Sequence, residues 1–222
     1  MKRWFFFTGL VAVLALLAPL QVSHAAEKSA KHYLGLGAEH MQAGRYPQAI
    51  EELSRAIQLD PDYDEAYRQR GNVYFRQGDH DKAIADYSEA LRLAPKNASN
   101  YANRALVYLE QGKLDEALTD FTAAINLDPK YAKGYSRRGR VYYQKGEYDK
   151  AIADCNKALE LDPKLAEAYF YKALACEQTD RIPEALESFK HFVEYAPPEY
   201  EAHTKIIRDK LKQYGETPQK TN

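Results

Sequence analysis

Residues 64–97 read DEAYRQRGNVYFRQGDHDKAIADYSEALRLAPKN, and closely similar segments lie on both sides of this stretch. The segments have a period of about 34 residues, and a proline marks the end of each one: Pro61, Pro95, Pro129, Pro163 and Pro197. Three more sets keep the spacing of the prolines: Tyr33, Tyr67, Tyr101, Tyr135 and Tyr169; Gly37, Gly71, Ala105, Gly139 and Ala173; Ala49, Ala83, Ala117, Ala151 and Ala185. A constant period of this length indicates a repeat architecture.

Each unit has the pattern of two amphipathic helices. In residues 64–97, the first half places Tyr67, Gly71 and Tyr74 on one helix face at i, i+4, i+7 spacing. The second half does the same with a further set: Ala83, Tyr87, Ala90 and Leu91. Gly78 is expected to end the first helix in a left-handed conformation, and the proline cannot continue the second. Each unit is therefore predicted to be a helical hairpin.

Glycine within the first helix of a unit needs a packing reason, because it costs about 1 kcal/mol against alanine in a helix interior. Gly71 and Gly139 stand at such positions. We expect them to allow close approach of the second helix, at Ala83 and Ala151 respectively.

The pattern within a unit is an aromatic at position 4, Gly or Ala at 8, Tyr at 11, Ala at 20, an aromatic at 24, Ala at 27 and Pro at 32. It resembles the tetratricopeptide repeat. Departures occur at a few of these positions: His40, Leu53, Cys155, Cys176 and Phe192. The resemblance implies an all-α fold of five tandem helix-turn-helix repeats of about 34 residues each, forming a right-handed superhelical solenoid.

The predicted organisation places the repeats at residues 30–63, 64–97, 98–131, 132–165 and 166–199. Ile206, Ile207 and Leu211 continue an apolar stripe, which predicts a capping helix over residues 200–214, because a terminal repeat must cover its open side. Residues 215–222 are polar and predicted to be a disordered tail.

Residues 1–25 have the pattern of an export signal. Lys2 and Arg3 precede an apolar run that reaches Leu17, and Ser23-His24-Ala25 places small residues at the positions that a signal peptidase needs. The run is shorter than the roughly 20 residues of a spanning helix. We therefore predict a signal peptide over residues 1–25, a linker over residues 26–29, a periplasmic or secreted mature protein, and no integral membrane segment after cleavage.

Composition and motifs exclude several function classes. The chain has 31 Lys and Arg against 32 Asp and Glu, so its net charge of −1 does not favour nucleic acid. Two cysteines and six scattered histidines offer no metal-site spacing. Nucleophile-elbow, zinc-protease and phosphate-loop motifs are missing from the sequence. We predict a non-catalytic protein without metal or cofactor that binds a protein or peptide partner.

Within the family, the first helices of the repeats line a concave groove, and five polar residues there resemble a carboxylate clamp for an acidic C-terminus: Arg68, Asn72, Asn103, Lys133 and Arg137. Cations and amides suit a pair of carboxylates. The alternative is that asparagine is simply frequent at these positions and the cations are solvated surface charge, with Glu65 and Glu110 competing for them.

Further side chains are expected to line the groove and to set specificity: Phe75, Leu106, Arg140 and Tyr143. The predicted function is an adaptor or scaffold that holds an extended peptide or a partner helix. Two alternatives stay open: an oligomerising structural component of an envelope or secretion assembly, and a chaperone-like module of the secretory pathway.

Cys155 and Cys176 both replace the residue that the family packs at that position. By resemblance these two positions face each other across adjacent units. In an oxidising compartment the two thiols could form a disulfide, and otherwise they would be buried as small apolar groups.

Overall fold

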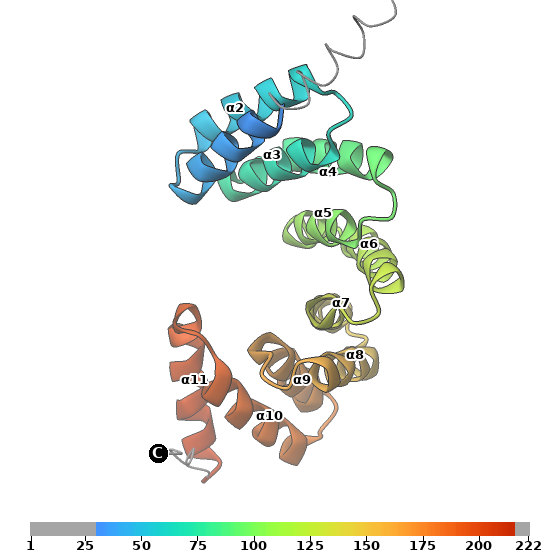
Figure 1. The fold of residues 1–222 in the computed structure, drawn as a ribbon. Helices are drawn as coiled ribbons and strands as arrows, with labels where there is room; N and C mark the ends of the chain where they lie inside the picture. The colour runs from blue at the N-terminus through green and yellow to red at the C-terminus, as the bar shows by residue number, and fades with distance from the viewer. Residues whose placement is uncertain (1–29, 216–222) are drawn as a thin grey trace, which may run out of the picture. The chain divides into compact units, whose positions relative to one another are not determined.

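The structure is a computed structural model, and it describes residues 30–215. The predicted signal peptide, the linker and nearly all of the predicted tail lie outside these residues. Within the described part all regular structure is helical, so the predicted all-α repeat fold with a C-terminal helix is confirmed (Figure 1).

The described chain divides into two compact units at Pro95. The first unit contains a helix over residues 30–42 and three further helices: α2 (Tyr46–Leu59), α3 (Asp64–Gln77) and α4 (His80–Leu93). The second unit contains α5 (Ala98–Glu110), α6 (Leu114–Leu127), α7 (Ala132–Gln144), α8 (Tyr148–Leu161), α9 (Ala166–Gln178), α10 (Ile182–Tyr195), the short 3-10 helix η1 (Pro198–Tyr200) and α11 (Glu201–Gln213).

The turn inside each hairpin is made by a residue with positive φ. Glycine takes this conformation in the first four hairpins, at Gly44, Gly78, Gly112 and Gly146, which recur at the spacing of the repeat. In the fifth hairpin the same place holds Asp180, with a φ of 56°. Asp tolerates the left-handed region better than most side chains do, yet less well than glycine.

Small residues allow the helices of a hairpin to approach closely. The alanine at position 20 is buried in every hairpin: Ala49, Ala83, Ala117, Ala151 and Ala185. A Cβ on Gly139 would lie 2.9 Å from Cys155 Sγ and 3.3 Å from the Ala151 carbonyl oxygen, as expected for that pair. At Gly71 the second helix also approaches closely, and its nearest atoms belong to the ring of Tyr87, which would lie 2.9 Å from the added Cβ.

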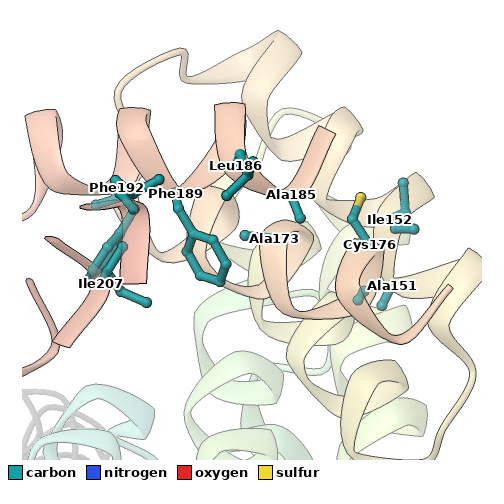
Figure 2. Packing of buried hydrophobic residues seen from close by; sticks show 12 residues of the cluster. Ala151, Ile152, Ala173, Cys176, Ala185, Leu186, Phe189, Phe192 and Ile207 are labelled. Atoms are coloured by element: carbon teal, nitrogen blue, oxygen red, sulfur yellow. The ribbon is translucent and has the colours of Figure 1, made fainter. Parts of the chain in front are cut away.

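A large buried cluster in the second unit joins α8, α9, α10 and α11. Figure 2 shows Phe189 directed toward Ala173 and Phe192 beside Ile207 of α11. Ile207 and Leu211 are buried, which stabilises the terminal helix by about 1.5–3 kcal/mol for each side chain. Ile206 is 66% exposed, so the predicted stripe is narrower than the sequence suggested.

Candidate functional site

Helix α7 carries three cations on one face. Lys133, Arg137 and Arg140 follow i, i+4, i+7 spacing, which brings them to the same side of the helix. The buried residues of α7 lie on both sides of this face, for example Gly139 on one side and Val141 on the other. The neighbouring helices therefore pack against the two sides of α7, and the cations lie on the face between these two contacts. The sequence predicted Lys133 and Arg137 as clamp residues and Arg140 as groove-lining, and the structure groups all three on α7.

Carboxylates of neighbouring hairpins already act on these cations. Glu110, at the end of α5, accepts a hydrogen bond of 3.3 Å from Arg140 Nη2, which is the competition that the sequence anticipated. Glu167 on α9 is half-buried, and burial raises its pKa, whereas the positive charges of Arg137, Arg140 and Lys133 oppose that rise. The cationic face of α7 therefore stabilises a carboxylate next to it.

Several hydrogen-bond donors near this face have hydrogens that no acceptor in the described chain takes. Arg140 Nε is buried and has no hydrogen-bond partner within residues 30–215. Arg137 donates through Nη1 to Tyr131 Oη at 3.3 Å, which leaves its other guanidinium hydrogens available. Burial raises the pKa of Tyr171 to about 12, so its phenol stays protonated and can donate. Arg140 also lies over the Tyr171 ring, with its guanidinium carbon 5.8 Å from the ring centroid.

Apolar side chains flank the cations in the second unit. Tyr143 packs its ring 6.1 Å from that of Tyr171 and 5.7 Å from that of Tyr148, measured between centroids. Leu106 on α5 is partly buried against the cluster around Phe121, and Asn103 lies one turn before it on the same helix. Tyr171 was not among the residues that the sequence predicted, although it stands as far from its junction proline as Arg137 does in the preceding repeat.

The remaining predicted residues lie on α3, in the first unit. Arg68 donates to Glu65 Oε1 at 2.9 Å, again as the sequence anticipated. Asn72 accepts a 2.7 Å hydrogen bond from the Tyr87 hydroxyl, and its amide nitrogen donates to Gln69. The Phe75 ring lies next to that of His80, with 5.9 Å between the ring centroids and the two planes tilted by 35°. The five clamp residues are thus divided, with Arg68 and Asn72 in one compact unit and Asn103, Lys133 and Arg137 in the other.

Cys155 and Cys176 are both free, buried thiols in the structure, the alternative to the disulfide that the sequence left open. Cys155 lies beneath Gly139 and packs with Ala158 and Ala168. Burial raises the pKa of both thiols, which makes them poor nucleophiles.

A repeated ion pair is the feature that sequence reasoning missed. Three arginines at position 7 each form a bidentate pair with an aspartate at position 23 of the same hairpin: Arg70–Asp86, Arg104–Asp120 and Arg138–Asp154, with N–O distances of 2.7–2.9 Å. We call these the Arg–Asp pairs. Arg70 and Arg138 also donate to a hydroxyl of the preceding hairpin, on Ser54 and Thr122. The constant separation of Arg and Asp along the sequence was the available signal.

The described residues contain neither a grouping of metal ligands nor a membrane-spanning helix. Among residues 30–215 no three His, Cys, Asp or Glu side chains are grouped as a metal ion would require. None of the helices in that range has the length and apolar character to cross a membrane.

Two family models match the chain. One, described as TPR repeat, matches residues 37–78, 71–112 and 106–146, and the other, described as tetratricopeptide repeat, matches residues 132–165. Together they span more than half of the sequence. No curated protein matches the chain.

Solved structures share the fold along most of the chain. A crystal structure of MamA protein is 24% identical, covers 84% of this chain and 96% of its own, and has a TM-score of 0.68. The pilF protein of Pseudomonas aeruginosa is 20% identical, covers 86% of each chain and has a TM-score of 0.76. YrrB, described as a TPR protein with an unusual peptide-binding site, is 21% identical, covers 83% and 97%, and has a TM-score of 0.64.

Proposed function

Because the chain belongs to the tetratricopeptide repeat family, whose members are protein-interaction modules, we propose that the cationic face of α7 binds the acidic C-terminus of an extended peptide. The observation that carries this proposal is the grouping of Lys133, Arg137 and Arg140 on one face of α7, where Arg137 uses only Nη1 for a hydrogen bond within the described chain. A peptide carboxylate would accept from the remaining guanidinium hydrogens of Arg137.

The energetic reason is the strength of charge-assisted hydrogen bonds. Each is worth about 1.5–3 kcal/mol when the acceptor is ionised, about twice a neutral bond. In the free protein Glu110 accepts a hydrogen bond from Arg140, and Glu167 lies within the electrostatic influence of all three cations. A ligand with two carboxylates would compete with both glutamates. Tyr143 and Leu106 supply apolar contact for the side chains that precede the C-terminus.

The test is a fluorescence-anisotropy titration with a labelled pentapeptide that ends in two acidic residues and a free carboxylate. We expect Arg137→Ala and Arg140→Ala each to weaken binding by about tenfold, the equivalent of one charge-assisted bond. Arg92→Ala is the matched control, because Arg92 is exposed and pairs with Glu89 on its own helix. The C-terminally amidated peptide should bind more weakly, and equal affinity for the two peptides would contradict the proposal.

The groove variants also separate this adaptor role from assembly through the repeat edges. If the protein is an oligomerising component, the Arg137→Ala variant should still self-associate, as measured by light scattering. Its peptide binding would then not depend on Arg137.

We also propose that the mature protein is exported, on the strength of the charged start, the apolar run and Ser23-His24-Ala25. Expression of the full chain in a bacterial host, followed by fractionation and intact-mass measurement, should give an extracytoplasmic product that begins at Ala26. A product of full mass would count against cleavage.

A further inference from the structure

A cleft of about 590 Å³ lies in the second unit between α8, α9 and α10. Its lining comes from all three helices: Asn156, Leu159, Glu160, Tyr169, Lys172, Glu184, Glu187, Ser188 and His191. On α9, Tyr169 lies to the opposite side from Glu167 and Tyr171, because residues two apart are separated by about 200° around a helix. The cleft is therefore a separate surface from the cationic face of α7.

The same place in the preceding hairpin is filled by one of the Arg–Asp pairs. Arg138 extends over the Tyr135 ring, pairs with Asp154 and donates to Thr122. One repeat later, three of these four positions have changed: Lys172 replaces the arginine, Ser188 the aspartate and Asn156 the threonine, while Tyr169 keeps the ring. We call this place the guanidinium niche: in the fifth hairpin it keeps the tyrosine ring but contains no arginine side chain.

These replacements leave polar groups without partners. Ser188 is only 3% exposed, lines the cleft, and forms no hydrogen bond through its hydroxyl within the described chain. Lys172 makes no ion pair there either, because its shorter side chain has no carboxylate at position 23 to reach. Because the Ser188 hydroxyl is not fully enclosed, a ligand group in the cleft can reach it, and such a hydrogen bond contributes about 0.5–1.5 kcal/mol net.

The net charge of the residues that line the cleft favours a positively charged ligand. Three glutamates stand against one lysine, and Glu184 has no ion pair within residues 30–215, its contact being a weak bond of 3.7 Å from Cys176 Sγ. Glu160 and Glu187 are partly neutralised by lysines outside the lining, at 2.7 Å from Lys157 and 3.6 Å from Lys190.

The aromatic part of the lining also favours a cation. The Tyr169 and His191 rings lie 4.9 Å apart between centroids and form one wall of the cleft. The face of a tyrosine ring attracts a positively charged group, as the Tyr135 ring does for Arg138 in the preceding hairpin.

We propose that this cleft binds an arginine side chain of a partner protein, which supplies from outside the guanidinium that Arg138 supplies within its own hairpin. The planar group would donate to Glu184, Ser188 and Asn156 while lying against Tyr169. Arginine suits the niche better than lysine does, because its five donors match several acceptors at once.

The test uses acetyl-arginine methylamide as the probe and its uncharged citrulline analogue as the comparison, followed by amide chemical shifts of Ser188 and His191 in the full chain. We expect the arginine probe to bind at least about tenfold more tightly than the citrulline probe, and Glu184→Gln to remove most of that difference. Glu116→Gln is the matched control, since Glu116 is an exposed residue of α6 outside the cleft; it should bind the arginine probe as the unmodified protein does.

A second variant fills the niche from within. Lys172→Arg with Ser188→Asp rebuilds an Arg–Asp pair, so it should abolish arginine binding while unfolding at the same or a higher urea concentration. Equal binding of the two probes, retained arginine binding in the double variant, or preferential binding of acetyl-glutamate methylamide would each overturn the proposal. The last result would make Lys172 the anchor for an anion.

Discussion

The Arg–Asp pair of α7 and α8 allows a sharp prediction for Asp154→Ala. Asp154 accepts two hydrogen bonds from Arg138, at 2.7 and 2.9 Å, and the side chains are only 11% and 17% exposed. Removing one partner of a buried pair costs about 3–5 kcal/mol because the other charge is left uncompensated. Thr122 and the rings of Tyr135 and Tyr142 still contact the guanidinium, so we expect a loss near the lower end, about 3 kcal/mol.

The assay is urea unfolding of the full chain followed by circular dichroism. Alanine is the better helix former, so helix propensity opposes the loss and cannot explain it. Asp149→Ala is the control on the same helix: its pair with Arg181 is exposed, and such pairs contribute about 0–1 kcal/mol. The double variant Arg138→Met, Asp154→Leu removes both charges and should unfold close to the unmodified protein. A loss below about 1 kcal/mol for Asp154→Ala would refute the reasoning, because it would mean that the pair is effectively solvated.

Three further predictions concern the second unit. Glu167→Gln should tighten binding of the acidic pentapeptide by about fivefold, because it removes a negative charge that competes for the cations, and close like charges repel by about 1 kcal/mol in water. Anisotropy measures this, and weaker binding would contradict the competition. Phe189→Ala should destabilise the protein by about 3–5 kcal/mol in urea, because the ring is fully buried against α9 and α11, whereas Ile206→Ala should change little because that side chain is 66% exposed. Asp180→Gly should stabilise the protein by about 0.5–1 kcal/mol, because glycine adopts the left-handed conformation at a φ of 56° without the strain that a side chain causes. Urea unfolding measures this, and a lower midpoint would mean that the Asp180 side chain contributes more stability than its backbone strain costs.

Local signals made the hairpins predictable. Gly78 and the prolines stop helices through their own backbone geometry, and the apolar spacing within each helix depends on neighbours a few turns away at most. These rules hold in water as they do in a folded protein, so the helix boundaries follow from the sequence alone.

The candidate site was only partly predictable. Lys133 and Arg137 were found because a helical spacing groups them before any tertiary contact is considered. Glu167 was missed because it becomes their neighbour only when α9 packs against α7. The periodic pattern also does not state which side chain of the opposite helix lies nearest to Gly71, and the structure shows that it is Tyr87.

The sequence by itself determined the period of the repeats, the position of each turn and the all-α fold, because all three depend on local stop signals and on the spacing of the apolar residues. The tertiary structure decided which charges pair. Arg138 finds Asp154 across its hairpin, whereas Lys172, at the same position of the next repeat, makes no ion pair in the described chain. Electrostatic pairing depends on distances between side chains of different helices, and only the packed hairpins set those distances.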